Sequence, residues 1–195
     1  MANTLLPTGT LQGMRVAILL ENGFEEAELL EPKWALEEAG AATFVISSNR
    51  DRVTASTPEQ AKIPVDIHLS SARAEDFHAL LLPGGTTNTR GLATNTDAVR
   101  FVKYLMHAGK PVAAIGVGPA TILSAQEVRG RTMTCDVSLE NELRKRGACY
   151  VDKDVVCDGN LVTSRRPDDI PAFIREMIRV FGKAREHSRD MRKIP

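Results

Sequence analysis

A chain of 195 residues, 43% of them hydrophobic, is long enough to form one domain with a substantial core. Its 25 basic and 25 acidic residues balance, which argues against nucleic acid as a partner, because proteins that bind it usually carry a basic excess. No apolar run reaches the ~20 residues of a membrane span, and residues 1–13 lack the basic start and apolar centre of a signal peptide. We therefore expect a cytoplasmic protein without a nucleic-acid or membrane partner.

Short apolar runs mark the strands in the first half of the chain. They predict strands at residues 14–20, 42–47, 63–69 and 79–82. The run at 63–69 alternates apolar and polar residues, as a strand at the edge of a sheet does. A helix is expected at 25–39, closed by Gly40, and Pro32 means that it either kinks or begins near Glu31. Residues 49–62 are polar and turn-rich, and a short helix is expected at 71–76.

The second half of the chain continues the alternation of helices and strands. Helices are expected at 97–108, 120–125, 139–146 and 168–184, and strands at 112–115, 150–151, 155–157 and 161–163. Uniformly apolar strands alternating with helices predict an α/β fold with a mostly parallel sheet and helices on both faces. We expect one domain over residues 14–184, an N-terminal extension over 1–13, and a charged, frayed tail over 185–195.

The three cysteines Cys135, Cys149 and Cys157 are widely spaced and form no C-x-x-C pair. That spacing argues against a structural zinc site. We expect three reduced thiols, no metal and no cofactor. The sequence allows Cys149 and Cys157 to lie on neighbouring strands, but it does not indicate a bond between them.

The carboxyl ends of the predicted strands indicate where a site should lie, because open α/β sheets bind ligands there. The first strand leads into Gly23-Phe24-Glu25-Glu26-Ala27-Glu28, the strand at 79–82 into Pro83-Gly84-Gly85, and the strand at 112–115 into Gly116-Val117-Gly118-Pro119. Hydrolases place Ser or Cys at a tight strand-to-helix turn of the last kind, where backbone N–H groups stabilise a thiolate or an oxyanion. The pattern predicts the backbone of an acyl-transfer site without its nucleophile.

Four segments resemble the ThiJ/PfpI superfamily, which includes PfpI-type intracellular peptidases and the protein deglycase. They are MRVAILLENGFEEAELLEP, ALLLPGG, KPVAAIGVGPATIL and VVCDGNLVTSRRPDDIPAF, and the resemblance extends over residues 14–184. It implies a flavodoxin-like three-layer sandwich related to class I glutamine amidotransferases. It also implies a homo-oligomer, at least a dimer and in some relatives a hexamer. Trp34 would then pack on a helix face or at the dimer contact.

The turn that follows the strand at 112–115 stands where hydrolases have their nucleophile elbow. In the ThiJ/PfpI superfamily this elbow reads A-I-C-H-G-P, and the present sequence departs from that pattern. Gly116 stands at the position of the nucleophilic cysteine, and Val117 at the position of the histidine that follows it. PfpI-type peptidases also use a glutamate from a neighbouring subunit shortly after P-G-G, and residues 86–90 (TTNTR) contain no acid. Glycine cannot form a covalent intermediate and valine cannot transfer a proton. The resemblance therefore implies a member of the family without cysteine-dependent hydrolysis.

Several polar residues remain as candidates for the pocket. Glu28 aligns with the family glutamate that hydrogen-bonds the cysteine, and Asp136 stands where PfpI-type proteins have a tyrosine. Glu28 and Asp136 could form an acidic pocket that holds a cation, an amine or a shared proton, and Glu25 is a further candidate for the pocket. Alternatively, Glu25 and Glu26 are simply acids in the first turn of a helix, and Asp136 caps one. Arg165 either binds a carboxylate or phosphate or anchors its loop.

Three hypotheses follow. The first is a diverged relative that keeps a small-ligand pocket and has a stress-related or regulatory role. The second is an enzyme whose acid–base groups are Glu28 and Asp136, with anion-binding backbone N–H groups at Gly85 and Gly118. The third is an interaction protein whose pocket has collapsed around Val117.

Overall fold

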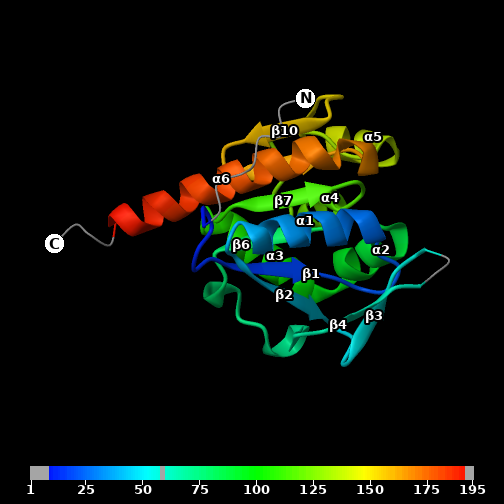
Figure 1. Cartoon of the computed structure of the whole chain (residues 1–195). Helices are drawn as coiled ribbons and strands as arrows, with labels where there is room; N and C mark the ends of the chain where they lie inside the picture. Colours follow the sequence, from blue (N-terminus) through cyan, green and yellow to red (C-terminus); the bar gives the residue numbers. More distant parts are fainter. Residues whose placement is uncertain (1–8, 58–59, 192–195) are drawn as a thin grey trace.

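The computed structural model describes residues 9–57 and 60–191, and its centre is a seven-stranded sheet (Figure 1). The strands run in the order β10-β11-β7-β6-β1-β2-β5, and all neighbouring pairs are parallel except β10 with β11. The expected mostly parallel sheet is therefore confirmed. The bounds of these strands are β1 Arg15–Leu19, β2 Ala42–Ser47, β5 Ile67–His68, β6 Ala79–Leu82, β7 Val112–Ile115, β10 Val155–Asp158 and β11 Leu161–Ser164.

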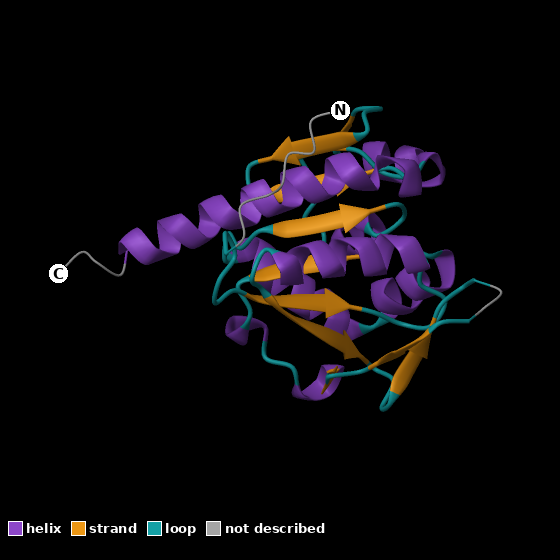
Figure 2. Cartoon of the chain, viewed as in Figure 1, coloured by secondary structure: helices purple, strands orange, loops and turns teal. Residues whose placement is uncertain are grey.

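Helices cover both faces of the sheet (Figure 2). Helices α1 and α6 contact each other on one face, and α2, α3 and α4 contact one another on the other face. A hydrophobic core lies on each face of the sheet, and alternate residues of β1 point into the two cores. Val16 and Ile18 pack in the core with α1 and α6, whereas Ala17 and Leu19 pack in the core with α3 and α4. The helices are α1 Glu26–Glu38, α2 Thr86–Thr94, α3 Thr96–His107, α4 Pro119–Ser124, α5 Glu140–Lys145 and α6 Ile170–Met191.

Two small sheets flank the main one and differ from the sequence prediction. Strands β3 (Arg52–Thr54) and β4 (Lys62–Pro64) form an antiparallel pair, so the turn-rich segment contains a strand. The single strand expected at 63–69 is divided into β4 and the edge strand β5. Asp66 interrupts it, because its carboxylate accepts a hydrogen bond from the Val45 N–H at 2.7 Å. The second pair is parallel and joins β8 (Thr132–Met133) to β9 (Cys149–Tyr150).

Helices α1 and α2 also refine the prediction. Helix α1 begins at Glu26 and includes Pro32 in its interior, so the alternative start near Glu31 is wrong. The sequence did not predict α2, because TTNTRGLAT is rich in residues of low helix propensity.

Both predicted terminal segments contribute to the domain. Helix α6 continues to Met191, so residues 185–191 are helical and the expected frayed tail is wrong there. Arg185 explains part of this, because its guanidinium donates to the Thr10 carbonyl at 2.8 Å. Leu11 is fully buried, and its N–H donates to the Ala39 carbonyl at 2.8 Å. The rest of the predicted extension and tail lies outside the described residues.

The cysteines are all free, and Cys149 and Cys157 lie in different sheets. Within residues 9–57 and 60–191, no group of three or more His, Cys, Asp or Glu side chains is arranged to hold a metal ion. None of the helices in the same residues has the length and hydropathy needed to cross a bilayer.

Candidate functional site

A cavity of about 380 Å³ opens at the carboxyl ends of β1, β6 and β7. The turns that follow these three strands meet there, as the fold class predicts. The cavity therefore brings together three segments that are far apart in the sequence. The residues that line it are Gly23, Glu25, Glu28, Ser56, Gly85, Thr86, Thr87, Gly116, Val117, Asp136, Ser138 and Pro167.

The turn after β7 has the backbone of a nucleophile elbow. Gly116 has φ +63°, in the left-handed region that favours glycine. The Gly118 N–H donates to the Ile115 carbonyl at 2.9 Å, and Pro119 then begins α4. On the far side, the Gly116 carbonyl accepts a hydrogen bond from the Asp136 N–H at 2.9 Å. The tight turn is thus held on both sides, but the residue at its tip presents no functional group.

The carboxyl group of Glu28 lies against this turn. The side chain comes from α1, is 3% exposed, and accepts a hydrogen bond from the Gly84 N–H at 2.8 Å. A Cβ atom built on Gly116 would lie 2.7 Å from both carboxyl oxygens of Glu28. A Cβ atom on Gly84 would lie 2.3 Å from Oε2. The Glu28 carboxyl would therefore have to shift if residue 116 carried a Cβ atom.

The environment of Glu28 raises its pKa from 4.5 to about 7. Burial is the largest cause, because it disfavours the charged form. The hydrogen bond from Gly84 opposes this effect, and the negative charges of Glu25 and Asp136 add to it. Near neutral pH both protonation states are populated, so the group can donate or accept a proton.

Asp136 lines the same cavity as Glu28, as the acidic-pocket interpretation requires, and Glu25 lines it too. Glu25 precedes α1, and its side chain makes no capping hydrogen bond there. Asp136 caps the 3₁₀ turn Val137–Leu139, since its carboxylate accepts from the Ser138 N–H at 2.9 Å. The capping interpretation of Asp136 therefore holds together with its place in the cavity wall. Glu26 is directed elsewhere and accepts from the Thr57 hydroxyl at 2.8 Å.

The backbone donors differ from the prediction at Gly118. Its N–H donates to the Ile115 carbonyl within the turn, so the prediction that this N–H binds an anion is wrong. The Gly84 N–H donates to the Glu28 carboxyl group. In the described part of the chain, the N–H groups of Gly85 and Val117 have no hydrogen-bond partner, and both residues line the cavity. These two are the donors that the turns offer to a ligand.

Arg165 does not line the Glu28 cavity. It lines a neighbouring cavity, and Asp136 is the one described residue that lines both. Its guanidinium donates to both oxygens of Asp169, at 2.9 and 3.1 Å, and to Asp152 at 2.7 Å. The guanidinium therefore anchors the loop, as one of the two interpretations of this residue expected.

Asn88 supports the site and was not singled out in the sequence. Its side chain is fully buried, and its Nδ2 donates to the carbonyls of Pro83 and Gly84 at 3.1 and 3.0 Å. Its Oδ1 accepts from the Glu21 N–H at 2.6 Å. One amide thus joins the turn after β6 to the turn after β1. The only signal in the sequence was an asparagine shortly after P-G-G, which is too common a pattern to indicate this role.

Replacing Asn88 with Ala should destabilise the protein by about 2 kcal/mol, because the Glu21 N–H and the Pro83 and Gly84 carbonyls lose a buried partner. Urea denaturation followed by circular dichroism measures this change. Asn95→Ala is a matched control, since Asn95 makes its hydrogen bonds as the cap of α3. A loss for Asn88→Ala no larger than that for Asn95→Ala would contradict the bridging role.

The sequence matches the DJ-1/PfpI family over residues 14–180. It is 41% identical over 170 residues to an uncharacterized protein from Archaeoglobus fulgidus, which covers 87% of this chain and 99% of that protein. It is 38% identical over 172 residues to general stress protein 18 of Bacillus subtilis, with 88% and 99% covered.

A solved structure gives the same assignment. A two-domain protein of Anabaena variabilis, with DJ-1/ThiJ/PfpI-like and ferritin-like domains, superposes with a TM-score of 0.82 and 31% identity. The match covers 86% of this chain and 50% of that one, so this chain spans half of the two-domain protein. The flavodoxin-like sandwich implied by the resemblance is confirmed. This chain belongs to the DJ-1/PfpI family.

Proposed function

We propose that this protein binds a small polar ligand in the Glu28 cavity and has no cysteine-dependent hydrolase activity. The observation that carries the proposal is the position of the Glu28 carboxyl, 2.7 Å from the Cβ that any side chain at position 116 would have. The Glu28 carboxyl thus faces a residue that has no side chain, at the position where a cysteine hydrolase of this family has its thiol. Val117 supplies no proton-transfer group next to it.

The lining of the cavity favours a neutral or cationic ligand. Three of its residues, Glu25, Glu28 and Asp136, carry carboxyl groups, and no Lys or Arg is among the described residues that line it. Hydroxyl groups of serine and threonine complete the polar wall. A ligand with an amine beside the carboxylates and an oxygen at the Gly85 and Val117 N–H groups would satisfy both kinds of partner.

A binding experiment with two probes of similar size tests this preference. Ethanolamine should shift the Gly85 and Val117 amide resonances in ¹H–¹⁵N spectra, whereas glycolate should not. Glu28→Gln should weaken the response to ethanolamine, and Glu26→Gln, which alters a neighbouring acid outside the cavity, should not. A preference for glycolate, or no response to either probe, would contradict the proposal.

Acid–base catalysis at Glu28 is a second candidate, favoured by its pKa of about 7. Water adds to the aldehyde of methylglyoxal, and Glu28 would remove the C1 proton of this hydrate and return it to C2, which gives lactic acid. The Gly85 and Val117 N–H groups would stabilise the negative oxygen of the enediolate between the two proton transfers. Pure protein would then convert small dicarbonyl compounds such as methylglyoxal, with a rate that changes near pH 7 and is lost in Glu28→Gln. Activity that iodoacetamide abolishes would count against both candidates, because it would require a cysteine.

The relatives suggest a wider role. Since one relative is named a general stress protein, we include a stress-related role in the proposal.

We also propose a cytoplasmic homodimer, or a higher oligomer such as a hexamer. Trp34 supports this proposal, because it lies on α1 and is 57% exposed in one copy of the chain. Trp34→Ala should lower the molar mass measured by light scattering, and an unchanged mass would remove Trp34 from the contact.

A further inference from the structure

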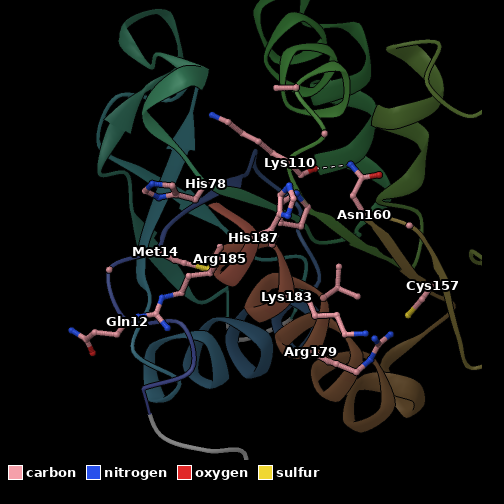
Figure 3. Close-up of a pocket in the computed structure, with 17 residues that line it drawn as sticks. Gln12, Met14, His78, Lys110, Cys157, Asn160, Arg179, Lys183, Arg185 and His187 are labelled. Carbon is pink, nitrogen blue, oxygen red and sulfur yellow. Dashed lines mark hydrogen bonds between the residues drawn. The ribbon is translucent and has the colours of Figure 1, made fainter. Parts of the chain in front are cut away.

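A second and larger cavity, of about 680 Å³, lies at the opposite end of the sheet from Glu28. Figure 3 shows it between α6 and the segments that precede the strands. Met14, His78 and Pro111 come just before β1, β6 and β7, and Gly159 and Asn160 form the turn between β10 and β11. None of the described residues lines both this cavity and the Glu28 cavity.

The charged residues that line this cavity are all basic. They are Lys110, Arg179, Lys183 and Arg185, with His78 and His187 beside them, and no Asp or Glu is among the described residues that line it. The whole chain has a formal net charge of zero. The lining of this cavity is therefore basic although the chain as a whole is balanced, while the Glu28 cavity carries three acids. Opposite ends of one sheet thus offer sites of opposite charge.

Three of the basic residues share one face of α6. Arg179, Lys183 and His187 follow one another at intervals of four residues, and Figure 3 shows them on the same side of the helix. Cations at this spacing repel each other. The helix dipole favours cations only in the last turn, and α6 ends at Met191, so it does not account for Arg179 and Lys183.

The individual cations differ in how they are held. The ammonium of Lys110 is directed to the carbonyls of Ala74, Glu75 and Phe77. Arg179 is paired with Glu176 at 2.6 Å. Lys183 makes no ion pair with any residue in the described part of the chain.

Arg185 is held without being neutralised. Its Nη1 donates to the Thr10 carbonyl, which fixes the guanidinium, and no carboxylate in the described part of the chain forms an ion pair with it. Lys183 and Arg185 are therefore the two cations most available to a ligand. A fixed guanidinium suits a phosphate, because it offers several N–H donors in one plane.

We propose that this cavity binds a small phosphorylated metabolite, with Lys183 and Arg185 holding the phosphate. The rest of the wall is suited to the uncharged part of such a molecule, since Met14, Pro111 and Val180 are apolar and Gln12 carries an amide. The volume lies in the range of small-molecule sites. The site is independent of the Glu28 cavity and of the function proposed for it.

Isothermal titration calorimetry with pyrophosphate, ADP and citrate tests the proposal on the full chain. Pyrophosphate and ADP should bind more tightly than citrate, and higher salt should weaken them. Lys183→Gln should lower their affinity about tenfold, as expected for the loss of one charge-assisted contact. Lys145→Gln is the matched control, because it removes the same charge from the exposed surface of α5.

Three results would overturn the proposal. One is the absence of binding by pyrophosphate and ADP at millimolar concentration. Another is equal or tighter binding of citrate, which would indicate a carboxylate site. The third is an affinity that Lys183→Gln leaves unchanged. If Lys183→Gln instead lowers the molar mass in light scattering and no phosphate binds, the basic cavity is a contact between copies of the chain.

Discussion

Glu28→Gln should be more stable than the wild-type protein above pH 7 and should lose most of the wild-type dependence of stability on pH between about 4.5 and 7. The pKa of Glu28 is raised from 4.5 to about 7 in the folded protein. Between these values the folded state binds the proton and the unfolded state does not. The free energy of unfolding therefore falls as pH rises through this interval. Above and below the interval, the ionisation of Glu28 does not change the free energy of unfolding.

The size of this effect follows from the shift, which corresponds to ~3 kcal/mol at 1.36 kcal/mol per pH unit. Glutamine can still accept the Gly84 N–H and carries no charge, so the variant should be more stable by about 2 kcal/mol at pH 8. Urea denaturation from pH 4.5 to 8 measures both quantities. Glu26→Gln should keep the wild-type dependence on pH. A Glu28→Gln protein with an unchanged slope would show that Glu28 ionises normally.

Gly116→Cys, the change that would restore the thiol of the family, should destabilise the protein by about 3 kcal/mol. A residue with a Cβ at φ +63° is strained by about 1 to 2 kcal/mol. The new Cβ would also lie 2.7 Å from both oxygens of Glu28, so the end of this side chain must shift, which weakens its hydrogen bond from the Gly84 N–H. Thermal unfolding at pH 7 measures the loss.

Alanine variants separate the two causes. Gly130 also has a positive φ, +75°, but a Cβ built there meets nothing within 4 Å. Gly130→Ala therefore measures backbone strain alone, and Gly116→Ala should cost clearly more. In a Glu28→Ala background that excess should disappear, since the carboxyl is gone. Equal losses for the two glycine variants would mean that Glu28 does not occupy the space beside Gly116.

Much of the fold could be predicted because local patterns and tertiary structure agree. Strands β2, β6 and β7 match their predicted bounds, since each is a short apolar run between turns. Helix α2 could not be predicted, because its residues favour other conformations and the buried Asn88 amide contributes to its packing. The end of α6 was missed for a similar reason, since Arg185 bonds a carbonyl 175 residues away in sequence.

The site could be placed from the sequence but its chemistry could not. Ligands bind at the carboxyl ends of parallel strands, and this rule located the three turns. The sequence also shows directly that residue 116 is a glycine. Whether Gly118 offers its N–H depends on a hydrogen bond within the turn, and the partners of Arg165 depend on a loop conformation. The raised pKa of Glu28 comes from burial and from acids on other segments, which no local pattern records.

The titration of Glu28 tests the account most directly. Carbon-13 NMR of the protein labelled at the glutamate carboxyl carbons follows each carboxyl group as pH changes. We predict one resonance with a midpoint near pH 7 that is absent from Glu28→Gln and present in Glu26→Gln. If every glutamate titrates near 4.5, burial does not raise the pKa of the carboxyl beside Gly116, and acid–base catalysis by Glu28 near neutral pH is contradicted.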